Sequence, residues 1–296
     1  MTETLRIGVS PYISAWPLID GLAEEAGAAL GFHPPSALAP LLKAGQLDAA
    51  LIPSIEYYRL AAVAGERARQ SAPMRIVALP VAAIGSRGAV GSVRLFGYAE
   101  PEQIRRVLLD SASRTANALV RLLLERPRAV QPHFVMPEEG VRSPDDVRLP
   151  SAGSGQALTP SPGKSARPPD AELLIGDAAL VAARPNALWV EDLGEEWDHR
   201  YHKPLAWAFW AARADAPIGR LVELLSAARD RGLAHLEELA ARASAERGIL
   251  PDVARRFLCH QVRYGFGQRE QLGTQFFYER AADECLAPLG VKLRFP

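Results

Sequence analysis

Residues 47–59, LDAALIPSIEYYR, contain the pattern that decides the fold. The apolar run 47–53 predicts a buried strand, and the residues after it predict a helix that begins near Ser54. The same order returns at 170–183, DAELLIGDAALVAA, where Asp177 is the polar residue that follows the strand. A strand that leads directly into a helix is the repeating unit of an α/β fold, and here it occurs in both halves of the chain.

The sequence on either side continues this alternation of strands and helices. We expect strands at 5–9, 47–53, 75–86, 93–99, 107–111, 132–137, 172–176 and 205–215. We expect helices at 14–25, 35–45, 55–65, 101–106, 113–126, 177–183, 217–243, 252–262 and 268–286. Strands that alternate with helices predict parallel α/β sheets, and two such cycles followed by helices predict two lobes.

The two lobes are expected to be discontinuous in sequence. Lobe I would comprise 1–95 and 212–296, and lobe II would comprise 96–211. Within lobe II, residues 138–169 are rich in Ser, Pro and Gly and lack apolar periodicity. This composition predicts a flexible surface insertion, for which a linker is favoured over a functional lid.

A ligand is expected in the cleft between the lobes, facing the loops that follow the strands. The loops predicted to meet there are 10–16, 53–56, 84–88, 111–115 and 176–177.

Composition and charge exclude several classes of function. The chain has 34 Lys and Arg against 34 Asp and Glu, so no global field favours nucleic acid or an anionic membrane. No signal peptide is visible, and no apolar stretch approaches the ~20 residues that span a bilayer, so a cytoplasmic protein is expected. The two cysteines and six histidines have no metal-ligand spacing, and no nucleotide-binding glycine motif is present. We therefore expect neither a metal nor a cofactor.

Residues 110–115, DSASRT, form the most informative candidate site. The first turn of a helix has unpaired N–H groups and the positive end of the helix dipole, which together favour an anion. Ser113 and Thr115 add hydroxyl groups, and Arg114 adds a guanidinium fork suited to a carboxylate. The alternative is that Ser113 only caps the helix while Arg114 points to solvent.

A second hydroxyl and arginine pair lies in 85–90, GSRGAV, where Ser86 and Arg87 stand between glycines that permit close approach of the backbone to a ligand. The alternative is a simple turn between strands. Ser54 either binds the ligand or caps its helix. Asp177 either caps the helix that follows it or fixes an arginine in the cleft.

Taken together, these motifs resemble the chorismate dehydratase (MqnA) family of the futalosine route to menaquinone. The resemblance rests on PYISAWPLIDGL, LDAALIPSIEYYR, SRGAVGSVRLF, LLDSASRTANALVRLLL, LLIGDAAL and RYGFGQREQLGTQFFYERA, which occur in the family's order. It implies a cytoplasmic, catalytic relative of the two-lobed (type 2) periplasmic binding proteins.

The resemblance also implies a hydro-lyase that converts chorismate to 3-[(1-carboxyvinyl)oxy]benzoate and water. Chorismate carries two carboxylates and needs anion sites. Our hypothesis is that Ser113, Arg114 and Thr115 hold one carboxylate while Ser86 with the neighbouring backbone holds the other. The catalytic base remains unassigned, and a carboxylate of the substrate is a candidate for it.

One position departs from the family pattern. At Ser14 the family commonly has Asn with its side chain facing the substrate, and serine is shorter and lacks the amide fork. We expect Ser14 to face the ligand, with Tyr12 and Trp16 as walls of the pocket or as core.

Two other functions stay open on the sequence. One is the related enzyme activity that forms 1,4-dihydroxy-6-naphthoate. The other is a non-catalytic protein that closes its lobes around a small carboxylate. The helical segment near the C-terminus would either cover the core or form a homodimer surface, and its pattern does not decide between them.

Overall fold

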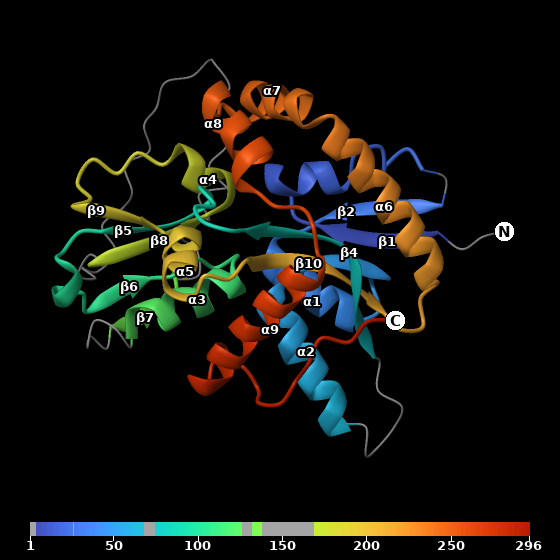
Figure 1. Cartoon of the computed structure of the whole chain (residues 1–296), viewed down its shortest axis with the longest axis horizontal. Helices are drawn as coiled ribbons and strands as arrows, with labels where there is room; N and C mark the ends of the chain where they lie inside the picture. The colour runs from blue at the N-terminus through green and yellow to red at the C-terminus, as the bar shows by residue number, and fades with distance from the viewer. Residues whose placement is uncertain (1–3, 26, 68–74, 126–131, 138–168) are drawn as a thin grey trace.

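Two five-stranded sheets lie side by side along the long axis of the molecule, with helices on their faces (Figure 1). This arrangement comes from a computed structural model, which describes residues 4–25, 27–67, 75–125, 132–137 and 169–296. The insertion predicted at 138–169 lies outside the described residues except for its last one.

The first sheet combines parallel and antiparallel strands. β1 pairs in parallel with β2 and β3, and β10 runs antiparallel between β3 and β4. β2 was not predicted, because its half-exposed residues lack a clear apolar pattern. In order across the sheet, the strands are β2 (Ala28–Phe32), β1 (Leu5–Val9), β3 (Ala49–Pro53), β10 (Leu205–Arg213) and β4 (Ile76–Ser86).

The second sheet repeats the same plan. β6 pairs in parallel with β7 and β8, and β5 runs antiparallel between β8 and β9. The expectation of purely parallel sheets is therefore wrong: the strands β5 and β10, which follow the two crossings between the sheets, each pair antiparallel to their neighbours. In order, the strands are β7 (His133–Val135), β6 (Arg106–Leu108), β8 (Ala171–Ile175), β5 (Val93–Gly97) and β9 (Trp189–Asp192).

The chain crosses between the sheets twice, at 87–92 and at 202–204. β5 thus belongs to the second sheet and β10 to the first. The lobe boundaries expected at 95/96 and 211/212 stay a prediction, but each lies beside or inside one of these strands.

Most of the predicted helices are present. The α-helices are α1 (Pro35–Lys43), α2 (Ser54–Arg67), α3 (Arg114–Glu125), α4 (Gly176–Val181), α5 (Leu193–Tyr201), α6 (Ile218–Ala234), α7 (Leu236–Arg247), α8 (Pro251–Arg256) and α9 (Gln268–Asp283). Shorter segments are the 3₁₀ helices η1 (Ile13–Leu18) and η2 (Pro101–Gln103) and the π-helical η4 (Phe257–Gln261).

The helix expected at 14–25 is wrong in kind and length. Only the 3₁₀ helix η1 forms, with Pro17 inside it. Proline has no N–H with which to continue an α-helical hydrogen-bond ladder, and Gly21 then adopts a left-handed φ of 66°. The loop after β1 therefore leads into a short 3₁₀ helix instead of an α-helix.

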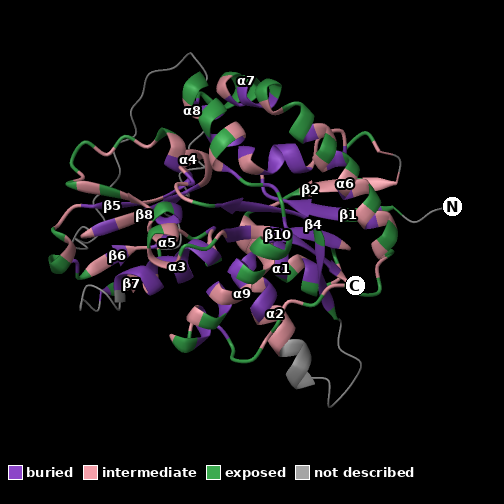
Figure 2. Ribbon diagram, in the orientation of Figure 1, coloured by how far each residue is buried: buried purple, intermediate pink, exposed green. Residues whose placement is uncertain are grey.

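The core runs through both sheets. Buried residues follow the strands and the inner faces of the helices, with exposed residues on the outer helix faces (Figure 2). Phe209 and Trp210 on β10 are fully buried, and the ring of Phe209 stacks on Phe266 with centroids 4.8 Å apart. In the described part of the chain, no helix has the length and apolar character to cross a membrane.

Candidate functional site

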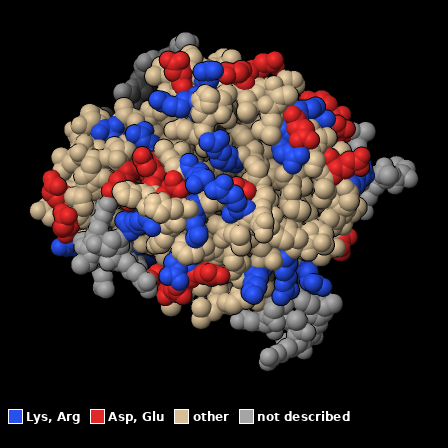
Figure 3. All heavy atoms as spheres, viewed as in Figure 1, with Lys and Arg blue, Asp and Glu red and all other residues tan. Residues whose placement is uncertain are grey.

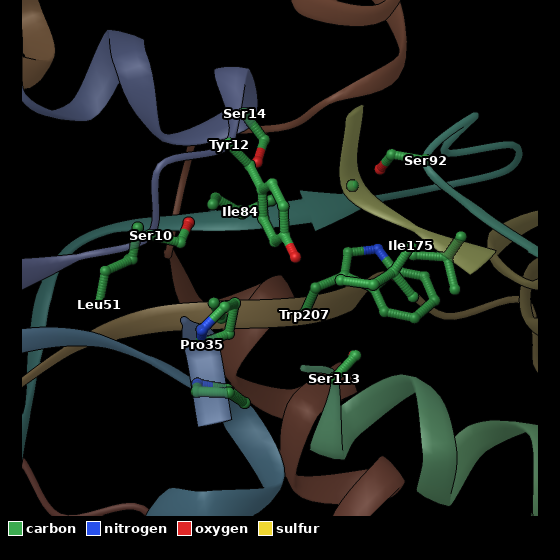
Figure 4. Close-up of a pocket in the computed structure, with 14 residues that line it drawn as sticks. Ser10, Tyr12, Ser14, Pro35, Leu51, Ile84, Ser92, Ser113, Ile175 and Trp207 are labelled. Atoms are coloured by element: carbon green, nitrogen blue, oxygen red, sulfur yellow. The ribbon is translucent and has the colours of Figure 1, made fainter. Parts of the chain in front are cut away.

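A pocket lies between the two sheets, where loops from both converge (Figure 4). Its cavity volume is about 80 Å³, and the pocket opens to solvent on one side. Every loop expected in the cleft contributes at least one lining residue, so that prediction is confirmed. The lining residues are Ser10, Tyr12, Ser14, Pro35, Leu51, Pro53, Ile84, Ser92, Val93, Ser113, Ile175, Gly176, Trp207 and Ala208.

The loop after β1 supplies one polar wall of the pocket. Ser10, Tyr12 and Ser14 all line it, and Figure 4 shows the Tyr12 ring extending into its middle. Ser14 sits at the second position of η1 and is half-buried. The expectations that Ser14 faces the cleft and that Tyr12 forms a wall therefore agree with the geometry, and Trp16 belongs to the core.

The start of α3 supplies the opposite wall. The Ser113 hydroxyl accepts a hydrogen bond from the Ala116 N–H at 3.1 Å, so Ser113 caps α3 while it also lines the pocket. Because a hydroxyl has its own proton, Ser113 can donate to a ligand at the same time. Arg114 is exposed and is not among the lining residues, which agrees with the alternative that its side chain points to solvent. Its contact with a bound carboxylate is a matter for the Arg114→Ala variant.

Thr115 and Ser54 meet beneath the pocket and do not line it. Both are buried, their hydroxyl oxygens are 3.4 Å apart, and the Ile55 N–H donates to the Thr115 hydroxyl at 3.4 Å. These contacts join the N-termini of α2 and α3, which follow strands of different sheets. In this arrangement both side chains hold the two halves together, and a direct contact with ligand stays a prediction.

Two tyrosines with raised pKa values lie behind Ser54. The Tyr278 phenol donates to the Ser54 carbonyl, and its ring lies 3.6 Å from the ring of Tyr58. Burial raises the pKa of Tyr278 well above its ordinary value. Burial also raises the pKa of Tyr58 to about 12, partly offset by a hydrogen bond from Gln275. Neither phenol is therefore suited to act as a base near neutral pH.

Ser86 does not line the pocket but is hydrogen-bonded to Trp207, which does. It is 2% exposed, and its hydroxyl accepts a hydrogen bond from the Trp207 indole N–H at 3.0 Å. Trp207 in turn lines the pocket from β10. Arg87, predicted to act beside Ser86, is exposed and is not a lining residue. Substrate binding by Ser86 and Arg87 thus stays a prediction.

The Ser86 and Trp207 contact can be tested through stability. Ser86→Ala leaves the buried indole N–H without its acceptor, so we expect the free energy of unfolding to fall by about 1–3 kcal/mol in urea titrations. Ser92→Ala is the matched control, because Ser92 is also a buried lining residue but its side chain makes no hydrogen bond among the described residues. Equal free energies of unfolding for the two variants would contradict this account.

Asp177 reaches the site from the second sheet. Its Oδ1 accepts a hydrogen bond from the Ile13 N–H at 3.1 Å, and its Oδ2 is 3.9 Å from Nε of Arg247. Beside it, Gly176 has a left-handed φ of 67° and packs closely against the Tyr12 ring. Asp177 does not line the pocket; its hydrogen bond instead joins the second sheet to the loop after β1.

The sequence alone did not identify Ser10, Ser92 and Trp207 as site residues. Ser10 and Ser92 stand next to strand ends, which is a usable signal, but serine is common at such positions. Trp207 lies inside an apolar strand, a position that is typical of a core residue. In β10 it falls at a register irregularity between Ala206 and Ala208, where it has no partner on β4, and its side chain lines the pocket.

The 14 lining residues include no Asp, Glu, His, Lys or Arg. The pocket instead offers serine hydroxyls and a phenol, which can donate to an anion, and its Ser113 directly precedes α3. On the surface, Lys and Arg side chains gather near the middle of the face in Figure 3. Within the described residues, no group of three His, Cys, Asp or Glu is placed to hold a metal. The pocket therefore suits a small ligand that brings its own negative charge.

Fold and site together define the class of protein first. Two sheets of this order with a pocket between them are the architecture of two-lobed, periplasmic-binding-protein-like proteins, as expected. An alkanesulfonate-binding protein of Xanthomonas axonopodis pv. citri is similar with a TM-score of 0.62 and 16% identity, covering 99% of this chain and 98% of that one. A protein of Archaeoglobus fulgidus has a TM-score of 0.63 and 16% identity, covering 96% and 98%. These likenesses concern the fold alone.

The family follows from the sequence comparison. A family model described as menaquinone biosynthesis matches residues 5–145 and 158–283, and the chain belongs to that family. A relative, the chorismate dehydratase of Thermus thermophilus, is 29% identical over 290 residues, covering 92% of this chain and 93% of the relative. The resemblance inferred from the sequence motifs is thereby confirmed.

Proposed function

We propose that this protein is a chorismate dehydratase, which converts chorismate to 3-[(1-carboxyvinyl)oxy]benzoate and water. The observation that carries the proposal is the pocket, which places four serine hydroxyls and one phenol among apolar residues and has no acidic, basic or histidine side chain in its lining. Chorismate brings two carboxylates to such a site. The 29% identity to a chorismate dehydratase over 92% of the chain supports the same substrate.

One carboxylate is held at the start of α3. The Ser113 hydroxyl and the unpaired amides of the first turn supply donors, and the helix dipole adds a favourable field. Ser10, Ser14 and Ser92 supply hydroxyls elsewhere in the lining for the other end of the substrate. This arrangement binds an anion with neutral donors and needs no guanidinium inside the pocket.

The elimination uses the substrate's own chemistry. Removal of the proton at ring carbon 3 sends its electron pair toward the ring carboxylate, and the hydroxyl at carbon 4 then leaves as water while the ring becomes aromatic. Since the lining contains no carboxylate or imidazole, a carboxylate of the substrate accepts the proton from carbon 3. The same carboxylate then returns this proton to the departing hydroxyl, so that one water leaves and the carboxylate is ionised again. Donors fixed around the ring carboxylate stabilise the charge that develops there.

The test is incubation of the purified protein with chorismate, with the product followed by chromatography and mass. We expect loss of one water per chorismate, at a rate well above spontaneous decay in a control without enzyme. Ser113→Ala is expected to lower kcat/KM by about 100-fold, the typical effect of removing one preorganised donor. Arg114→Ala is expected to change it by no more than about twofold, as for an exposed side chain.

The variants separate the competing assignments. A large loss with Arg114→Ala and none with Ser113→Ala would return the carboxylate to Arg114, as first expected from the sequence. Product from Ser14→Asn but not from the wild type would mean that serine disables this site. Binding of chorismate without turnover in both would favour a binding protein and contradict the proposed enzyme.

A further inference from the structure

The 3₁₀ helix η1, which carries Ser14, is capped by Asp177 of α4, the helix that follows β8 of the second sheet. Its own N-cap residue, Tyr12, makes no side-chain capping hydrogen bond. The N–H of Ile13, the first residue of η1, instead donates to Asp177 Oδ1 at 3.1 Å. The two residues are 164 positions apart in sequence. This donor of η1 is therefore satisfied only when the two sheets have the arrangement described here.

Arg247, the last residue of α7, also contacts the loop after β1. Its Nη2 donates to the Pro11 carbonyl at 2.9 Å, and its Nε lies 3.9 Å from Asp177 Oδ2. One guanidinium thus contacts the backbone just before Tyr12 and also the carboxylate that caps η1. Pro11, Ile13 and Asp177 are thereby linked around the two lining residues Tyr12 and Ser14.

A neighbouring arginine provides an internal comparison. Arg242 and Arg247 both lie over the Trp16 ring, with guanidinium carbons 4.3 and 5.7 Å from its centroid. Arg242 pairs with Glu246 on its own helix at 2.9 Å. Of these two arginines, Arg247 alone donates a hydrogen bond to the loop after β1 in the described part of the chain. The two side chains thus share a helix and an aromatic partner but differ in their contact with the site.

We propose that Arg247 is a positioning residue for the site, acting through the Pro11 carbonyl and Asp177 to fix Tyr12 and Ser14 against the bound substrate. The step to catalysis rests on the proposed dehydratase function. The Arg247 side chain is 41% exposed, so its ion pair adds little to global stability. Its effect is on the position of the loop after β1, because a small displacement of residues that contact the substrate lowers kcat strongly.

The experiment compares Arg247→Gln with Arg242→Gln in the full chain. Hydrogen–deuterium exchange is measured over 10–18 without substrate, kcat and KM are measured with chorismate, and urea unfolding is followed for both. For Arg247→Gln we expect exchange over 10–18 at least about threefold faster than in the wild type and kcat about tenfold lower, with an unchanged unfolding midpoint. Arg242→Gln is expected to match the wild type in all three measurements.

The exchange measurement does not depend on the proposed function. If the wild type fails to turn over chorismate, that failure concerns the dehydratase, and faster exchange in Arg247→Gln alone still supports the positioning of the loop. If exchange over 10–18 in Arg247→Gln matches that in Arg242→Gln, the proposal is overturned. It is equally overturned if an active wild type and Arg247→Gln share the same kcat.

Discussion

Gly232→Ala is expected to lower the free energy of unfolding by about 3 kcal/mol, the upper range for overpacking a well-packed contact. Gly232 lies in α6 where this helix crosses η1. A Cβ at this position would stand 2.1 Å from the Pro17 carbonyl oxygen and 2.5 Å from its Cα. Because these are backbone atoms, η1 or α6 must shift as a unit. Urea titration followed by circular dichroism measures the loss.

Gly219 in the same helix is the matched control. A Cβ there meets nothing within 4 Å, so Gly219→Ala is expected to leave stability unchanged or raise it by up to about 1 kcal/mol through helix propensity. Since η1 also carries Ser14, Gly232→Ala is expected to reduce turnover as well. Equal unfolding free energies for the two alanine variants would show that α6 and η1 adjust without strain, contrary to this expectation.

The location of the site was predictable because the relevant signals are local. A buried strand such as 47–53 is followed directly by a polar residue, and the carboxyl ends of neighbouring strands face one cleft. Ser113 is predictable in the same way, because it is the polar residue directly before a well-formed helix. It both caps that helix and lines the pocket. In these cases one stretch of sequence is sufficient to place the residue.

The remaining features depend on contacts between distant segments. The guanidinium groups of Arg87 and Arg114 suggested anion binding, yet both side chains are exposed outside the pocket lining, which offers hydroxyls and amides. Nothing near Asp177 in the sequence indicates that it caps η1, since its partner Ile13 is 164 residues away. Likewise, the antiparallel direction of β10 is set by the return of the chain from the second sheet and not by residues of the strand itself.

Gly176→Ala is expected to reduce kcat/KM for chorismate by about 100-fold, because it acts where the two sheets meet over the pocket. Gly176 has a φ of 67°, which strains any residue with a Cβ. That Cβ would also lie 2.7 to 2.9 Å from three atoms of the Tyr12 ring. Tyr12 must then turn or the sheets must separate, and either change displaces a lining residue.

Gly290→Ala is the control that separates the effect of backbone strain at a positive φ from the effect of the close contact with Tyr12. Gly290 has a φ of 76° and no atom within 4 Å of the added Cβ, so its variant is expected to lose about 1 kcal/mol of stability with no change in turnover. Steady-state kinetics and urea unfolding on both variants distinguish the two effects. A loss of stability in Gly176→Ala similar to that in Gly290→Ala, together with a much lower kcat/KM, would attribute the loss of rate to Tyr12. If Gly176→Ala instead turned over chorismate like the wild type, the Tyr12 ring would not have to lie against Gly176 for catalysis, and the close approach of the two sheets at this point would serve only the fold.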